Sequence, residues 1–452
     1  LSLVGSEMCI RDSRYTHCPA SLTVAHRNLP ILFADNMLIA NCIYHRNELS
    51  SPDNISENTY RTVIGQTHES ILAEYEEMNT GNAYTDNVLY GMRKINGVNY
   101  QLTGGFCGEL SSVKQENAYS AHSYSFYTVP RIEWERNDFL FTAATTVRWS
   151  HLPKQSYSRF CVSPFFCFRY KFTPRWKMSL LGSLDESEGG LKDIYPFRYR
   201  EDYRTVVKHT GKVPVTVRQL YTCYLEYKNT IKEFFWTLSA SYSHNRYNLI
   251  TERNYKDGNF YLSSVERNHS SHSYTLNTIG SKGIYDWNLK TSLELTLARN
   301  EGKQLNEGIV QDYRYDYLCI EPKIVWAPSV FFEAEYKATV SCVGGGIGED
   351  TSLDPLWEVA QRLTLSLEFH DTEFRLSGEH FYNDLSKNQH LNIWLADVSL
   401  IHKVGKWRFA ASAINLFNKE QYRYTLYSAV QSYTSWIKLR PREFMVSVQY
   451  QW

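Results

Sequence analysis

The sequence contains no run of about 18 apolar residues, so no segment is expected to cross a membrane as a helix. It has no net charge, because 48 Lys and Arg balance 48 Asp and Glu, and this removes the electrostatic case for a nucleic-acid partner. No Cys-x-x-Cys pair, Ser-His-Asp set or paired carboxylates stand out. These absences predict a protein that is not an enzyme, with no catalytic residues, no metal site and no cofactor.

Tyrosine is unusually abundant in this chain. The chain has 34 Tyr, against 22 Phe and 6 Met. Rings with a polar tip suit membrane interfaces and ligand-facing loops. The mean hydropathy of −0.44 does not argue against a membrane barrel with a wet lumen, because only every second strand residue meets lipid there.

The last ten residues alternate as a β-strand that ends on an aromatic residue. Phe444, Val446, Val448, Tyr450 and Trp452 fall on one face, and Met445, Ser447, Gln449 and Gln451 fall on the other. About ten residues suffice for a tilted strand to cross a bilayer. We expect the first set to face lipid and the second set to face the lumen of a barrel.

Similar strands recur along the chain as hairpins. The clearest runs from Trp287 to Thr296, where apolar and polar residues alternate. Short turns are expected near residues 136–138, 173–175, 228–232, 282–286, 327–329, 370–373 and 402–406. Long Tyr-rich segments, expected as loops at the opposite end, are 183–218, 243–273, 298–317, 341–361 and 417–436.

The faces of these strands predict the fold class. The expected lumen face is charged: Lys177, Lys290, Glu294, Glu333, Glu335, Lys337, Glu368, Arg375, Glu379, Asp397 and Arg408. Tryptophans flank the turns or strand ends, as in an aromatic girdle or an ordinary β core: Trp149, Trp176, Trp236, Trp287, Trp326 and Trp407. A sandwich would fill its second face with apolar residues, and a propeller would show a repeat of about 40–45 residues. The pattern indicates an all-β, transmembrane antiparallel β-barrel, with about fifteen strands in the clear hairpins and the last strand and about four more in residues 14–125.

Residues 1–13 are expected to be foreign. The codons ATG TGT ATA AGA GAC of a transposon-type sequencing adapter encode residues 8–12, Met-Cys-Ile-Arg-Asp. A signal peptide is the alternative, but Glu7 interrupts a short apolar run. We expect the barrel to occupy residues 14–452 and the natural protein to begin further upstream.

The most binding-like segment lies between residues 195 and 204. Aromatic rings and guanidinium groups can stack on and bond a ligand, although packing against neighbouring loops is the alternative. The candidate ligand-binding residues are Tyr195, Phe197, Arg198, Tyr199, Arg200, Tyr203 and Arg204.

Three other motifs receive plainer interpretations. His269 and His272 could hold a metal only in a loop, because such a pair points to opposite faces of a strand. The Gly-rich run 344–348 lacks the Lys-Ser/Thr of a nucleotide loop and is expected to be a flexible loop. Cys161 and Cys167 lie too far apart along a strand to bond to one another.

Two C-terminal segments carry a family resemblance. Residues 415–422 read Asn-Leu-Phe-Asn-Lys-Glu-Gln-Tyr, and residues 439–452 form the closing strand with its aromatic end. Together they resemble the TonB-dependent outer-membrane receptors. The residue pattern of positions 125–452 is similar to that of the Bacteroidetes-type barrels of that family.

The resemblance implies that residues 14–452 form an outer-membrane β-barrel, of about 22 strands when intact, whose N-terminal plug and first strands are missing here. Such a barrel lies in the bacterial outer membrane and binds a scarce nutrient at extracellular loops for TonB-energised uptake. The implied partners are outer-membrane lipid, a small-molecule, glycan or peptide ligand, and the TonB complex, reached through the missing N-terminal region. A passive plug-less pore is the alternative. An outer-membrane lipase or protease would need a catalytic cluster at the loops, and none is found in the sequence.

Overall fold

The computed structural model folds as one 21-stranded sheet and a separate two-stranded hairpin. Almost every strand pairs antiparallel with its neighbour in sequence, which is the hairpin pattern that the sequence predicts. The structure describes residues 13–26, 34–49, 76–90, 98–114, 118–194, 196, 198–200, 205–348, 351–386, 389–427 and 432–451.

The first part of the wall consists of long strands joined mostly by hairpin turns. Their bounds are β1 Ser13–His26, β2 Ala34–Leu49, β3 Glu76–Tyr90, β4 Val98–Lys114, β5 Ala118–Arg136, β6 Phe139–Leu152, β7 Tyr157–Lys171 and β8 Trp176–Glu188. The wall continues in β11 Val215–Asn229, β12 Phe234–Lys256, β13 Asn259–Ile284, β14 Leu289–Asn306, β15 Ile309–Ser329 and β16 Phe332–Ile347. It ends in β17 Thr351–Phe369, β18 Thr372–Ser386, β19 Gln389–Val404, β20 Trp407–Ile414 and β23 Glu443–Tyr450.

Short elements fill two of the connections and some of the turns. They are the 3-10 helices η1 Pro153–Gln155, η2 Leu191–Ile194 and η3 Tyr285–Trp287, and the strands β9 Arg198–Arg200, β10 Thr205–Lys208, β21 Gln421–Tyr427 and β22 Ser432–Lys438. No helix in the described residues is both long and apolar enough to cross a membrane.

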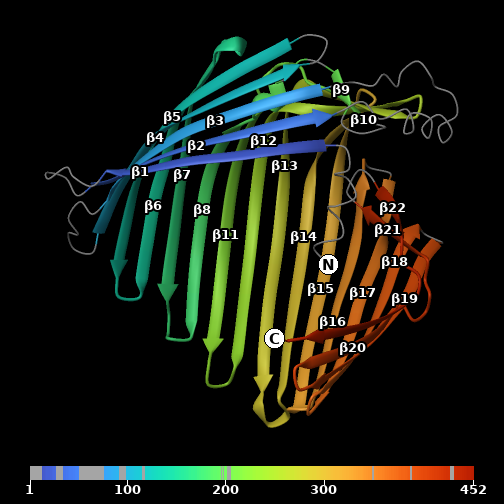
Figure 1. The fold of residues 1–452 in the computed structure, drawn as a ribbon. Helices are drawn as coiled ribbons and strands as arrows, with labels where there is room; N and C mark the ends of the chain where they lie inside the picture. The colour runs from blue at the N-terminus through green and yellow to red at the C-terminus, as the bar shows by residue number, and fades with distance from the viewer. Residues whose placement is uncertain are drawn as a thin grey trace.

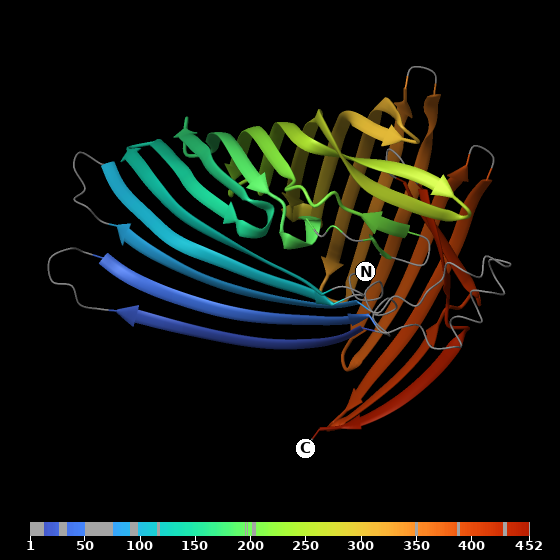
Figure 2. The same ribbon diagram turned by 90° about the horizontal axis from the view of Figure 1, so that it is seen from above.

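The sheet curls into an open barrel wall (Figures 1 and 2). Strands β1 to β5 lie nearly crosswise to β12 to β16, as expected for a strongly twisted and curved sheet. Within the described residues β1 pairs only with β2, and β23 pairs only with β20, so these two strands form the edges.

One face of the wall is convex and apolar. On β6 and β7 the directly opposed pairs Phe141–Phe168 and Trp149–Phe160 share this face. The register carries the same face through Leu297–Leu318 to Phe409–Val448 at the last strand. Phe444, Val446, Val448 and Tyr450 are therefore on the convex face, as their alternation predicts, and the first three are more than half exposed.

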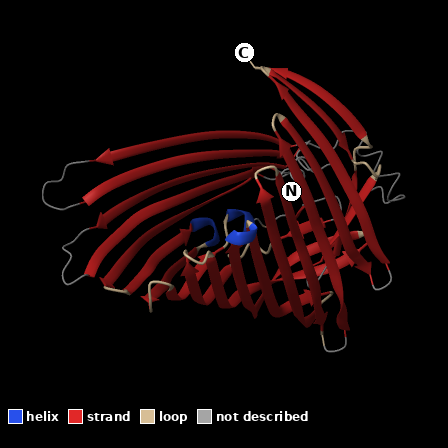
Figure 3. Cartoon of the chain, turned by 90° about the horizontal axis from the view of Figure 1, so that it is seen from below, coloured by secondary structure: helices blue, strands red, loops and turns tan. Residues whose placement is uncertain are grey.

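The opposite face is concave. The side chain of Ile194 in η2 is fully buried against Ala121 and Leu152, which point away from the convex face. Figure 3 shows short helical turns inside the curve of the sheet.

Two rows of aromatic rings border the convex apolar belt. The row beside the short turns contains Trp176, Trp236, Trp326 and Trp407, and the ring centroids of Trp176 and Trp236 are 6.0 Å apart. The row farther up the strands contains Trp149, Tyr274, Trp357 and Trp394. On β6, Trp149 lies about ten residues beyond Phe139, and on β19, Trp394 lies about ten residues before Val404.

The concave face is polar, as predicted. The register puts on it every charged residue that the sequence assigns to the lumen. Some of these charges form ion pairs with neighbouring strands, such as Lys177–Glu226 at 2.9 Å and Lys323–Glu335 at 3.2 Å. All of these pairs are partly exposed, so water can reach them.

Three of the expected long loops are instead extensions of strands, which corrects that prediction. Residues 243–256 belong to β12 and 259–273 to β13, with a tight turn at Asp257 and Gly258. Segments 298–317 and 341–361 are likewise mostly strand. Polar residues on both faces removed the apolar alternation by which a strand is recognised, yet the backbone pairing continues.

The Gly-rich run is also a strand rather than a flexible loop. Gly344 to Ile347 lie in β16, where the pairing with β17 shifts at Val343 and Gly345. A Cβ at Gly345 would collide with the carbonyl oxygen of Arg314 on β15. Glycine there allows a close approach of two backbones.

The motif at residues 415–422 connects β20 to β21 and forms hydrogen bonds to the segment that precedes β23. The buried side chain of Asn415 donates from Nδ2 to the carbonyl oxygens of Lys419 and Arg440, each at 2.8 Å. Its Oδ1 accepts from the Lys419 amide at 2.9 Å, and Asn418 Oδ1 accepts from the Arg442 amide at 2.9 Å. The two asparagines, both with positive φ, therefore hold the closing strand in place.

Candidate functional site

The long β8–β11 connection folds back against the concave face at the end of the wall away from the short turns. Buried contacts anchor it, since Ile194 and Val213 pack with Ala121 of β5 and Leu152 of β6. The 3-10 turn of η2 is closed by Asp193, whose carboxylate accepts from the Gly190 amide at 2.9 Å. A polar region lies beside this anchored connection, at the end of the wall away from the short turns.

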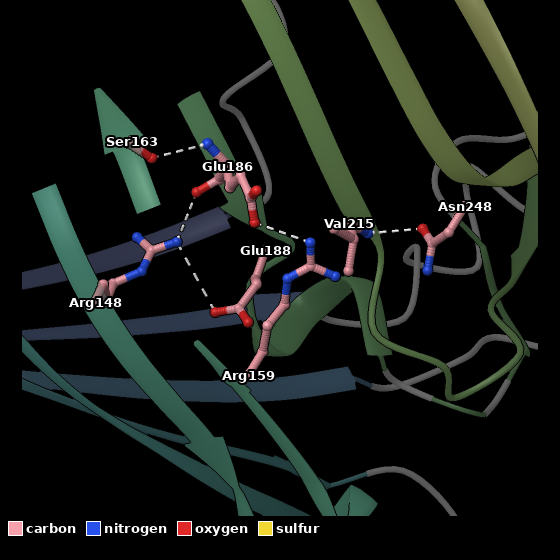
Figure 4. Close-up of polar contacts among 7 residues, drawn as sticks. All are labelled: Arg148, Arg159, Ser163, Glu186, Glu188, Val215 and Asn248. Atoms are coloured by element: carbon pink, nitrogen blue, oxygen red, sulfur yellow. Dashed lines mark hydrogen bonds and ion pairs between the residues drawn. The ribbon is translucent and has the colours of Figure 1, made fainter. Parts of the chain in front are cut away.

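Two arginines and two glutamates form the centre of that region (Figure 4). Arg159 on β7 donates to the Glu186 carboxylate at 2.9 Å, and Arg148 on β6 donates to the Glu186 carbonyl oxygen at 2.9 Å. Arg148 also lies 3.9 Å from the Glu188 carboxylate, whose side chain is only 10% exposed. The Glu186 amide donates to Ser163 Oγ at 3.0 Å, which fixes the backbone that carries both carboxylates.

The ionisation of this cluster follows from burial and charge. Burial, reinforced by the Glu188 carboxylate, raises the pKa of Tyr157 to about 12, with Arg159 opposing the effect. The hydrogen bond to Glu186 raises the pKa of the Arg159 guanidinium, so that this group stays charged. At neutral pH the region thus contains a neutral Tyr157 phenol beside a charged Arg159 that is paired with Glu186.

An amide side chain ties this region to the next pair of strands. Asn248 lies where the β12–β13 pairing is interrupted between Tyr247 and Leu249. Its Oδ1 accepts from the Val215 amide at 2.7 Å (Figure 4). Its Nδ2 donates to the Val213 carbonyl oxygen at 2.9 Å. The bulge therefore holds the start of β11.

A cavity of about 770 Å³ adjoins this bulge. Its lining comes from β7, β11, β12, β13, β14 and β15, and its charged members are Arg159, Arg246, Arg267 and Lys303. Tyr157, Tyr247 and His269 add rings. Burial lowers the pKa of His269, whose Nδ1 lies 3.3 Å from the Arg267 carbonyl oxygen.

The structure places only part of the predicted binding segment. Arg198, Tyr199 and Arg200 form β9, which pairs with β10, and β10 runs parallel to β13. The guanidinium carbon of Arg198 lies 5.8 Å from the centre of the Tyr261 ring. The candidates Tyr195, Phe197, Tyr203 and Arg204 lie outside the described residues. A binding role for this segment stays a prediction.

The paired-histidine motif is not a chelating pair. His269 and His272 both lie within β13, where His269 is opposite Tyr247 and His272 is opposite His244. The loop conformation that chelation requires is absent there. His272 instead approaches His244 and Tyr242, with its Nδ1 3.2 Å and 3.0 Å from their polar atoms. In the described part of the chain no three His, Cys, Asp or Glu side chains form a metal-binding group.

The six cysteines whose side chains the structure describes form no disulfide bonds. Cys161 and Cys167 lie on the same strand, β7, which agrees with the prediction that they cannot bond to each other.

Sequence reasoning missed the cationic cavity. Its arginines and lysine are spread over four strands, and only the strand register and the β12–β13 bulge bring them together. The spacing of these residues carries no motif.

Comparisons with solved structures find matches of low similarity. The chain is similar to the unliganded ferric citrate transporter FecA, with 11% identity, a TM-score of 0.45, and coverage of 96% of this chain and 70% of that chain. It is similar to the ferric yersiniabactin uptake receptor FyuA from Yersinia pestis, with 9% identity, a TM-score of 0.32, and coverage of 96% and 79%. A mutant of the ferric enterobactin receptor PfeA from Pseudomonas aeruginosa gives 10% identity, a TM-score of 0.28, and coverage of 96% and 79%.

No protein-family model and no curated protein matches the sequence. The structural similarities have low identities and low TM-scores, and no function is inferred from them.

Proposed function

We propose that the chain forms the wall of a bacterial outer-membrane receptor or transporter, and that it binds a ligand at the end away from the short turns. The observation that carries the proposal is the convex apolar belt between two rows of aromatic rings. At about 3.4 Å per residue and a tilt of about 40°, ten residues rise about 26 Å, close to the apolar band of about 25 Å in outer-membrane barrels.

The concave face supports the same proposal. A soluble sheet would cover one of its faces with a second apolar layer. Here the concave face carries ion pairs such as Arg362–Glu379 at 3.3 Å, and these suit a water-filled lumen or a polar plug. Lipid is then the partner of the convex face.

The connections at the two ends of the wall differ, and the difference indicates which end faces the cell exterior. At one end the turns are tight, as between β17 and β18. At the other end two connections carry additional structure: η2, β9 and β10 after β8, and the β21–β22 hairpin after β20. Outer-membrane barrels have short periplasmic turns and longer extracellular loops, so we assign the elaborated end to the cell exterior.

Capture of a scarce nutrient for TonB-energised uptake is the finer form of the proposal. It rests on the motif at residues 415–422 with the closing strand, and on the polar region beside the β8–β11 connection. The energy-coupled step would need a region of protein beyond this wall. A passive pore is the second candidate, because a polar concave face would also line a channel.

Uptake and permeability measurements separate the two candidates. In the full-length protein, replacing Tyr199 and Arg200 together by alanine should weaken ligand uptake without reducing barrel assembly, and uptake should cease when the proton-motive force is dissipated. A passive pore would conduct small solutes after reconstitution in planar bilayers, with or without the double substitution. That conductance, together with uptake that persists without the proton-motive force, would contradict the receptor proposal.

A further inference from the structure

The β12–β13 hairpin bends at an irregular step. Tyr247 pairs with His269, but the next pair is Leu249 with Glu266, so Asn248 on one strand and Arg267 and Asn268 on the other have no partner in the ladder. Bulges of this kind re-aim side chains and often border functional sites. The bonds from Asn248 to Val213 and Val215 hold the step in place.

Positive charge gathers in the cavity beside this step, and the one carboxylate at the step, Glu266, is paired with Lys212 at 3.1 Å. Arg159, Arg246, Arg267 and Lys303 line the 770 Å³ cavity, whereas no Asp or Glu does. Two of the cations have carboxylate partners outside the lining, since Arg159 bonds Glu186 at 2.9 Å and Lys303 lies 3.7 Å from Asp312.

The other two cations are uncompensated. Within the described part of the chain, neither Arg246 nor Arg267 forms an ion pair, and both are exposed. Two like charges beside one cavity repel each other and are stabilised by a bound anion.

We propose that this cavity is a binding site for a small multivalent oxyanion, of the phosphate-ester or oligocarboxylate class. Arg246 and Arg267 would hold the anion by forked, charge-assisted hydrogen bonds. Lys303 adds a point charge, and the rings of Tyr157 and Tyr247 border the space. The volume lies within the range of about 300–1,000 Å³ that is typical of small-molecule sites.

The inference deepens the proposed receptor function by naming the ligand class, but its test requires neither cells nor transport. The two proposals can therefore fail separately.

The test measures binding of pyrophosphate and of tricarballylate to the chain purified in detergent, by calorimetry, with maltose as the uncharged comparison. We expect at least one of the anions to bind and maltose not to bind, and the stronger anion distinguishes phosphate from carboxylate recognition. Arg246→Gln and Arg267→Gln should each weaken binding about tenfold or more, because a hydrogen bond to a charged group is lost. Arg136→Gln is the matched control, an exposed arginine beside the tight β5–β6 turn at the other end of the wall, and should leave the affinity unchanged.

A second measurement uses the unaltered chain, in case a variant does not fold. Hydrogen exchange at the amides of residues 267–270 should slow when the bound anion is added, and the turn at residues 136–138 should not respond. The proposal is overturned if neither anion binds better than maltose, if both arginine variants bind as the parent does, or if exchange at residues 267–270 is unaffected by saturating anion.

Discussion

If the convex belt faces lipid, two neighbouring residues on β17 should differ strongly in their tolerance of a charged side chain. Leu363 lies on the convex face and is 45% exposed, whereas Thr364 lies on the concave face directly opposite Glu335. Leu363 is six residues from the end of β17 at Phe369. At strand rise and usual tilt this is about 15 Å above the tight turn, near the middle of a band of about 25 Å.

An arginine at each position should therefore have opposite consequences. Leu363→Arg places a guanidinium near the bilayer midplane, at a cost of about 2–4 kcal/mol, which lowers the folded-to-unfolded ratio about 30- to 700-fold. Thr364→Arg places the same group beside a carboxylate in a wet lumen, and its effect should stay within about 1 kcal/mol.

Urea titration of the chain folded into lipid vesicles, followed by tryptophan fluorescence, measures both effects. The adjacent substitution is the control, because it adds the same side chain to the same strand. Equal losses of stability for the two variants, or a larger loss for Thr364→Arg, would refute the assignment of faces.

Three further predictions concern the closing strand and the first residues. Val446→Arg or Val448→Arg should impair membrane assembly much more than Ser447→Arg, as measured by the yield of folded protein in membranes; equal tolerance would reject the alternation on β23. Asn415→Gly keeps the positive φ but removes three hydrogen bonds to backbone, so it should cost about 2–4 kcal/mol in the same urea titration. Asn418→Gly removes one such bond and should cost about a third of that; the reverse order would contradict the assigned role. Reassembly of the locus from adapter-trimmed reads should yield no codons for residues 3–13, and finding them in genomic DNA would disprove the adapter interpretation.

The wall of the fold could be predicted from the sequence wherever one strand face meets an apolar environment. Between Trp287 and Thr296 the alternation of apolar and polar residues is regular, and β14 follows it. The same contrast correctly sorted the charged residues of the concave face, because charge and hydrocarbon are strongly incompatible.

The upper parts of the strands could not be recognised in this way. At His244 and His272, opposed on the β12–β13 hairpin, polar residues occupy the face that is apolar farther down. When both faces meet water, the period of two disappears from the sequence, although backbone pairing continues. That is why segment 243–273 was expected to be a loop.

The cationic cavity was beyond sequence reasoning for a different reason. Arg159 and Lys303 lie on β7 and β14 and share a cavity only through the register of the intervening strands and the bulge at Asn248. A bulge depends on how two strands pair, and neither strand alone encodes it. By contrast, the Tyr- and Arg-rich composition near residues 195–204 could be read directly, but composition does not determine the backbone conformation.

The most direct test of the central claim is surface labelling of single introduced cysteines in intact cells. Tyr199→Cys lies on β9 at the elaborated end of the wall, and Thr173→Cys lies in the tight β7–β8 turn at the other end. The parent chain provides the baseline, because it already contains cysteines. The account predicts that a membrane-impermeant maleimide labels Tyr199→Cys above this baseline and labels Thr173→Cys only after the outer membrane is opened. Labelling of Thr173→Cys but not Tyr199→Cys from outside would invert the topology and contradict the account.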